Sequence, residues 1–173
     1  MRDQLTVYVH TGRVLREFVI ATKGSDILVP SKDSLLWGLI KQHLTVWEHR
    51  STTPKDPDEC IQIAVRSSNG LVSYSARSRR QECYRSQYRC YLTCKGERII
   101  QRYLKKEFKK TFRDYMTGCL SNNPDITIVE AIEEFLTDFN VTPDRIITVE
   151  SLRKDWYRYS MKVAGDDRMS LEM

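Results

Sequence analysis

The segment from Arg77 to Arg98, RSRRQECYRSQYRCYLTCKGER, concentrates side chains that can bind other molecules. It holds seven Lys or Arg, three Tyr and three Cys, but only two Glu. Arginines between tyrosines are typical of proteins that bind single-stranded nucleic acid, because guanidinium groups hold phosphates while the rings stack on bases. Three cysteines could instead hold a zinc ion. A third interpretation is the solvated face of an ordinary helix.

The cysteine spacing argues against a metal site. Cys83, Cys90 and Cys94 follow a C-x6-C-x3-C pattern, whereas structural zinc sites usually join a C-x2-C or C-x4-C pair to a second pair or to histidines. Cys90 and Cys94 would share a helical face and could pack there as small apolar side chains. An odd total of five cysteines, without an export signal, also favours free thiols. We therefore expect no metal and no other cofactor.

A second group of cations lies on a predicted amphipathic helix over residues 96–118. Apolar side chains recur there at i, i+3, i+4 and i+7. The other side carries a basic stripe, which consists of Arg98, Arg102, Lys105, Lys109 and Arg113. Cations at this spacing repel one another unless a polyanion or acidic side chains screen them. Duplex DNA presents one phosphate charge per ~1.7 Å of its axis. We therefore predict binding of nucleic acid, with duplex DNA preferred, through the basic stripe, assisted by Arg79, Arg80 and Arg85.

Charge is distributed unevenly over the 173 residues, whose net charge is +5. Residues 1–76 are nearly neutral, with nine basic and eight acidic side chains. Residues 77–113 hold thirteen basic and three acidic side chains, and residues 114–173 hold six and twelve. Such asymmetry indicates a polyanionic partner for the middle segment. The alternative is that the acidic C-terminal third folds back and neutralises the basic segment.

Two shorter helices are predicted near the C-terminus. The first, over 128–139, begins at a capping box formed by Thr127 and Glu130, in which side chain and backbone bond reciprocally. Its buried face is expected to hold Val129, Ile132, Leu136 and Phe139. The second helix covers 149–162 after Thr148, and helical spacing directs Leu152, Trp156 and Tyr159 inward. Trp156 is therefore expected to be a core residue.

This helix pair has the outline of a helix-turn-helix. In DNA-binding examples the second helix meets base edges, and here its exposed side carries Arg153 and Lys154. However, the connection of about nine residues exceeds the 3–4 that are typical of the motif. The first helix is also acidic, which disfavours a position beside phosphates. A plain helical hairpin that completes the core is the favoured interpretation, with base readout as the alternative.

The N-terminal part predicts strands around one helix. Leu5–His10 alternates like a strand, and Arg13–Thr22 is interpreted as a second strand, joined to the first by a turn at Thr11-Gly12. A helix with Ser31 or Asp33 as its cap follows, and residues 60–65 form a strand that Asn69-Gly70 turns back. The fold class is therefore α+β, with two hairpins around one helix and a helical C-terminal half. We expect a sheet subdomain over 1–76, a basic segment with its long helix over 77–120, a hairpin over 121–163 and a tail over 164–173.

The sequence contains no complete catalytic motif. Glu107 and Lys109 match the E-x-K fragment of some nucleases, but they lie in the middle of a helix without carboxylates that converge on one metal ion. His49-Arg50 matches only a fragment of a recombinase site. The apolar runs are far shorter than the roughly 20 residues that span a bilayer. We therefore expect a non-enzymatic cytoplasmic protein without membrane association.

The strand LTVYVH together with FNVTPDRIITVESLRKDWYRY near the other end resembles uncharacterised small basic proteins of phages and mobile elements of gut Bacteroidetes. This resemblance implies a mobile-element setting, where small DNA-binding and regulatory proteins are frequent, and it supplies no site residues. We expect a nucleic-acid-binding protein with a regulatory role. The alternative is a protein–protein interaction or assembly module without nucleic-acid binding, in which the acidic third of one copy meets the basic segment of another in a homo-oligomer.

Overall fold

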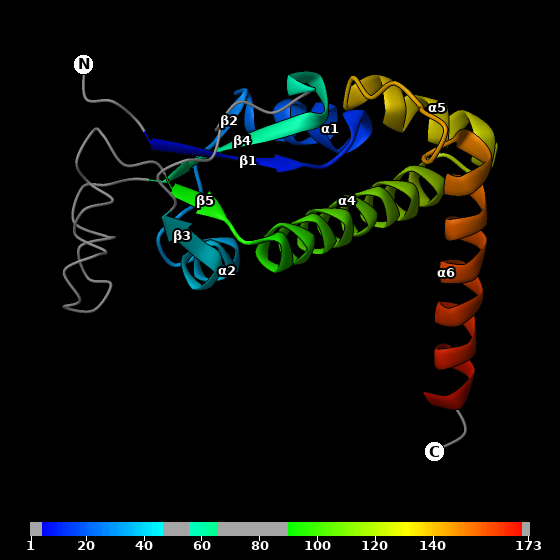
Figure 1. Cartoon of the computed structure of the whole chain (residues 1–173). Coiled ribbons are helices and arrows are strands. Elements are labelled where there is room, and N and C mark those ends of the chain that lie inside the picture. The colour runs from blue at the N-terminus through cyan, green and yellow to red at the C-terminus, as the bar shows by residue number, and fades with distance from the viewer. Residues whose placement is uncertain (1–4, 47–55, 66–89, 171–173) are drawn as a thin grey trace. The chain divides into compact units, whose positions relative to one another are not determined.

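The computed structural model describes residues 5–46, 56–65 and 90–170 (Figure 1). The chain divides into two compact units, Met1–Lys105 and Lys106–Met173. The described residues form an α+β fold, as the sequence predicts.

A three-stranded sheet forms the centre of the first unit. Strand β4 (Cys60–Val65) lies between β1 (Leu5–His10), to which it is antiparallel, and β2 (Ile27–Leu28), to which it is parallel. The register pairs Leu5 with Val65 at one end of β1 and His10 with Cys60 at the other. All of β4 except Gln62 is buried, which explains its nearly continuous apolar sequence. The short 3-10 helix η1 (Pro57–Glu59) leads directly into β4.

The segment after β1 is helix α1 (Arg13–Lys23), so the predicted first hairpin is wrong. The helix is bounded by Gly12 at φ 81° and Gly24 at φ 66°, in the left-handed region that favours glycine. It contacts η1, β2 and β4. Its buried side chains recur at helical spacing, and they are Val14, Leu15, Phe18 and Val19. Burial of this one face outweighs the strand preference of its valine, phenylalanine and isoleucine residues.

Helix α2 (Leu35–His43) confirms the one helix predicted in the N-terminal part, with a different cap. Ser34 is the N-cap, because its Oγ accepts a hydrogen bond from the backbone N–H of Trp37 at 3.1 Å. Strand β3 (Leu44–Val46) follows at once and pairs antiparallel with β5 (Cys90–Leu92). The predicted hairpin around Asn69-Gly70 lies outside the described residues.

Helix α4 (Cys94–Asn122) confirms the predicted long amphipathic helix and extends it at both ends. Its buried residues keep the predicted spacing, and they are Ile100, Leu104, Phe108, Phe112 and Met116. Cys90 lies in β5, whereas Cys94 is exposed at the start of α4. The expectation that these two cysteines share a helical face is therefore wrong.

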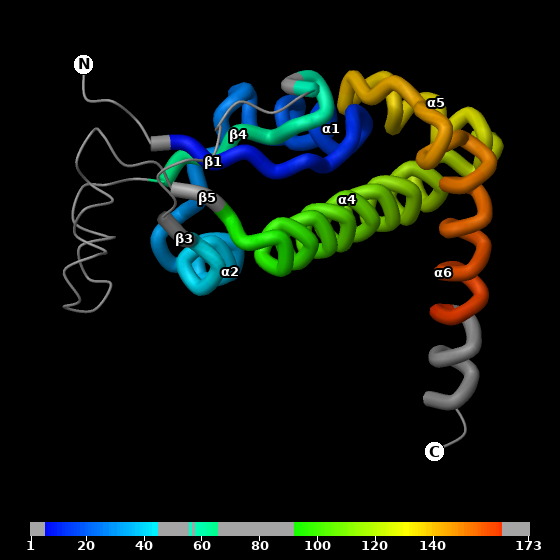
Figure 2. Tube along the Cα trace, in the orientation of Figure 1, coloured from blue at the N-terminus to red at the C-terminus, as the bar shows by residue number. Residues whose placement is uncertain are grey.

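The second unit contains the C-terminal part of α4 together with α5 (Ile128–Asp138) and α6 (Val149–Ser170). Figure 2 traces the chain that connects α5 to α6. The predicted capping box of α5 is confirmed, since the backbone N–H of Glu130 donates to Thr127 Oγ1 at 3.2 Å and the N–H of Thr127 donates to Glu130 Oε2 at 2.8 Å. These bonds from Thr127 lower the pKa of Glu130. Thr148 caps α6, which continues to Ser170, beyond the predicted end at 162.

An aromatic cluster forms the core of the second unit. Phe135 is completely buried, and its ring contacts the rings of Phe108, Phe112, Tyr115 and Phe139. The predicted buried face of α5 was wrong at Val129, which is 37% exposed, and it missed Phe135. Trp156 and Leu152 are buried in α6, which confirms the predicted inward face.

Candidate nucleic-acid interface

In the first unit, α4 carries the N-terminal three cations of the basic stripe. Arg98, Arg102 and Lys105 are exposed, and none of them forms an ion pair or hydrogen bond with a residue that the structure describes. Their spacing of four and three residues places them on one helical face. The opposite face is buried through Ile100 and Leu104. The helix therefore presents these three cations to solvent.

Hydrogen bonds attach this end of α4 to the end of strand β1. Glu97 Oε1 accepts from the backbone N–H of His10 at 3.0 Å, and the side-chain amide of Gln101 donates to the carbonyl of His10. His10 is held in turn, because its Nε2 lies 2.8 Å from Glu59 Oε2. These contacts fix the first turns of α4, which carry Arg98 and Arg102.

Gly96 allows α4 to begin close to α2. A Cβ at this position would overlap the side chain of His43 and would lie 3.2 Å from Thr93 Oγ1. The backbone N–H of Gly96 also donates to Thr93 Oγ1 at 3.1 Å. The absence of a side chain at position 96 therefore sets where the basic stripe starts.

In the second unit, the remaining two cations of the basic stripe bind Asp155 of α6. Lys109 Nζ lies 2.7 Å from Asp155 Oδ1, while Arg113 Nε and Nη2 lie 3.0 Å and 2.9 Å from Oδ2. The guanidinium of Arg113 also lies over the ring of Tyr159, 5.0 Å from its centroid. Burial acts to raise the pKa of Asp155, but the hydrogen bonds and charges of Lys109 and Arg113 outweigh it and lower the pKa.

The basic stripe is thus partly neutralised inside the second unit. The acidic C-terminal third supplies one carboxylate to two of the five cations, as the alternative interpretation of the charge asymmetry expected. Lys106 and Lys110, which flank the basic stripe, are exposed and pair with no described residue. The sequence did not indicate Asp155, since no local pattern links it to residues more than forty positions earlier.

The other predicted contact residues have different environments. Arg153 and Lys154 both pair with Glu150 of the same helix, at 3.2 Å and 3.6 Å. Exposed pairs of this kind contribute little free energy, so they leave both cations able to exchange partners. Arg79, Arg80 and Arg85 lie outside the described residues.

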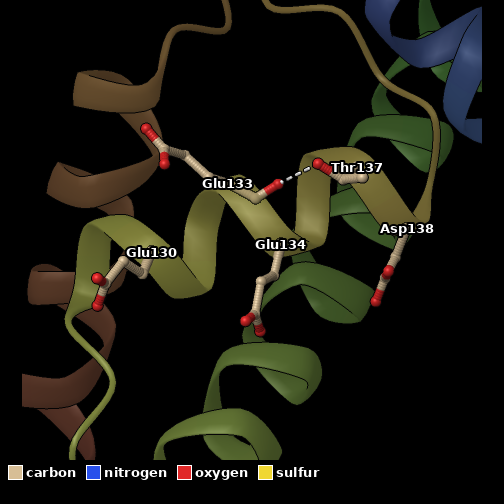
Figure 3. A pocket seen from close by; sticks show the side chains of 5 residues that line it. All are labelled: Glu130, Glu133, Glu134, Thr137 and Asp138. Carbon is tan, nitrogen blue, oxygen red and sulfur yellow. Dashed lines mark hydrogen bonds between the residues drawn. The ribbon is translucent and has the colours of Figure 1, made fainter.

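An acidic depression of about 310 Å³ lies along α5, and Figure 3 shows the residues that line it: Glu130, Glu133, Glu134, Thr137 and Asp138. Three of its four carboxylates are engaged. Glu130 Oε2 accepts from the backbone N–H of Thr127, Asp138 Oδ2 accepts from Tyr115 Oη at 2.7 Å, and Glu134 Oε2 accepts from Cys119 Sγ at 3.5 Å. Burial and the bond to Asp138 raise the pKa of Tyr115. Among the described residues, no three His, Cys, Asp or Glu side chains are grouped so that they could hold a metal ion.

The chain matches no protein-family model, no curated protein and no solved structure. In the part of the chain that the structure describes, no helix is both long and apolar enough to cross a membrane.

Proposed function

We propose that this chain is a non-enzymatic nucleic-acid-binding protein whose partner is duplex DNA. The observation that carries the proposal is the exposed triad of Arg98, Arg102 and Lys105, which has no anionic partner among the described residues. At 1.5 Å of helix rise per residue the triad covers about 10 Å. Duplex DNA presents about six phosphate charges over that length. Binding would release the counterions of these phosphates and relieve the repulsion between the three cations.

The sequence around this surface supports the same partner. Arg79, Arg80 and Arg85 precede α4 in the segment with the highest density of basic residues, and we propose that they add phosphate contacts. Arg153 and Lys154 form a secondary group, because their shared partner Glu150 is exposed. We propose that this activity serves a regulatory role in the cytoplasm and that the protein belongs to a phage or mobile element.

Salt dependence of binding tests the proposal. The full chain is titrated with a fluorescent DNA duplex, the matching single strand and an RNA duplex over a series of salt concentrations. The logarithm of the affinity should fall linearly with the logarithm of salt, by about 0.9 per phosphate contact on duplex DNA. Replacing Arg98, Arg102 and Lys105 with Gln should reduce this slope by about 2.7, which is the sum for three contacts.

A matched variant separates these contacts from net charge. Gln at Lys23, Lys32 and Arg145 removes the same charge from exposed positions outside the basic stripe, and it should change the slope much less. Equal slopes for the two triple variants would refute the assignment to Arg98, Arg102 and Lys105. A wild-type chain that shows no salt-dependent affinity for any of the three nucleic acids would refute the proposed function.

A protein-interaction module is the second candidate, and the acidic depression on α5 favours it. Four carboxylates line this open surface of the helix (Figure 3), and their negative charge would suit a basic segment of another copy. Light scattering at low and high salt tests this candidate. Self-association that disappears at high salt, without affinity for nucleic acid, would support it, whereas a monomer at both salt concentrations would contradict it.

A further inference from the structure

We infer that Lys109 and Arg113 form a phosphate-binding site, and that Asp155 occupies this site in the unbound protein. Asp155 is then an internal competitor of nucleic acid, and its carboxylate stands where a phosphate group would bind. This inference rests on the proposed function, because it specifies how one part of the same basic surface is regulated. All of the residues involved belong to the second unit.

The geometry around Asp155 matches what a phosphate requires. Its two carboxylate oxygens have separate partners, since Lys109 Nζ contacts Oδ1 while Arg113 Nε and Nη2 contact Oδ2. A flat pair of guanidinium donors beside an ammonium group is an arrangement that binds carboxylate and phosphate oxygens alike. The ring of Tyr159 lies against the guanidinium of Arg113 and holds its plane. The donors are therefore already oriented before any ligand binds.

The exposure of the three side chains allows exchange. The side chain of Lys109 is 53% exposed and that of Arg113 is 31% exposed, whereas that of Asp155 is only 15% exposed. A phosphate that approaches from solvent would thus meet the cations before it meets the carboxylate. Pairs that are partly open to water contribute little to stability, so replacing the carboxylate with a phosphate group would not unfold the unit. A phosphodiester of a DNA duplex cannot be buried as deeply as the carboxylate of Asp155. The exchange would therefore also move the side chain of Lys109 toward solvent.

The test compares two variants that remove one negative charge each. Asp155→Asn frees Lys109 and Arg113, whereas Glu133→Gln removes a carboxylate that pairs with no cation among the described residues. In salt titrations of the full chain with a DNA duplex, Asp155→Asn should bind more tightly than wild type. It should also steepen the slope by up to about 1.8, because two phosphate contacts are added. Glu133→Gln should give a smaller gain in affinity and no such change of slope.

A third variant shows whether the gain depends on the two cations. When Lys109→Gln and Arg113→Gln are combined with Asp155→Asn, the added slope should disappear. Circular dichroism at 222 nm establishes that each variant is folded, and Asp155→Ser provides a second neutral variant for the same comparison. The inference is overturned if Asp155→Asn behaves like Glu133→Gln, or if its gain persists without Lys109 and Arg113.

The same data distinguish failure of the inference from failure of the proposed function. Wild-type binding with a normal salt slope, together with no specific effect at Asp155, would refute only the inference. No salt-dependent binding by wild type or by any Asp155 variant would refute both. Binding that appears only after Asp155→Asn would support the inference, with Asp155 as a strong competitor, and would refute the proposed function of the unmodified chain.

Discussion

Removal of the Phe135 ring should destabilise the second unit more than any surface change. This side chain is completely buried, and its ring centroid lies 4.7 Å from that of Phe139, 5.2 Å from Phe112, 5.4 Å from Tyr115 and 5.8 Å from Phe108. Most of these rings meet edge to face, which is the favoured geometry for aromatic pairs. Phe135 therefore joins α4 and α5 through one residue.

The size of the effect follows from burial and from these ring contacts. Replacing a buried Phe with Ala costs about 3–5 kcal/mol, and we expect Phe135→Ala to reach about 4–5 kcal/mol because no part of the ring is exposed. Phe135→Leu keeps most of the volume but loses the aromatic pairs. Each pair contributes about 0.5–1.5 kcal/mol and they are not additive, so a loss of about 2 kcal/mol is expected. Both values are large beside a total stability of roughly 5–15 kcal/mol.

Urea denaturation of the full chain, followed by circular dichroism at 222 nm, measures these losses. With a slope of about 2 kcal/mol per molar urea, Phe135→Ala should lower the midpoint by about 2 M. Tyr157→Ala is the matched control, because Tyr157 is 48% exposed on α6 and should cost no more than about 0.5 kcal/mol. A loss below about 2 kcal/mol for Phe135→Ala would show that the aromatic cluster does not hold the helices together.

Three further changes test the interior and the ion pairs of α6. Trp156→Ala should lower the free energy of unfolding by about 3–5 kcal/mol, since Trp156 is buried. Replacing both Arg153 and Lys154 with Ala should leave the melting temperature nearly unchanged. Equal shifts of the melting temperature in the two variants would contradict this expectation. The pKa of Asp155 is lower in the folded chain, so its ionised form stabilises the fold above the unfolded pKa of about 3.9. The stability difference between wild type and Asp155→Asn should therefore be constant near neutral pH and shrink as the pH falls toward the lowered folded pKa. A difference that stays constant in urea titrations as the pH is lowered into the acid range would refute this.

Local signals predicted several elements correctly. The capping box at Thr127 and Glu130 fixed the start of α5 because both hydrogen bonds form within four residues. The spacing of Leu104, Phe108 and Phe112 identified the buried side of α4 because this pattern persists over many turns. Such features depend on contacts between near neighbours in the chain, and these are visible in a sequence.

Features that depend on packing between distant segments were not predictable. The segment of α1 is rich in residues that favour strands. Only the tertiary burial of one helical face, which includes Phe18, makes this segment a helix. The contact of Asp155 with Lys109 and Arg113 depends on how α6 packs against α4. An excess of acidic residues suggested neutralisation, but it could not show which carboxylate binds which cations.

The close approach at Gly96 has a consequence for how this protein can change over generations. Every other amino acid brings a Cβ, which would collide with His43, so no single replacement at position 96 is neutral while His43 stays in place. Positions 43 and 96 are therefore coupled, and substitutions at one become tolerable only after a change at the other. The start of α4, and with it the placement of Arg98, is held by a pair of positions that can drift only together.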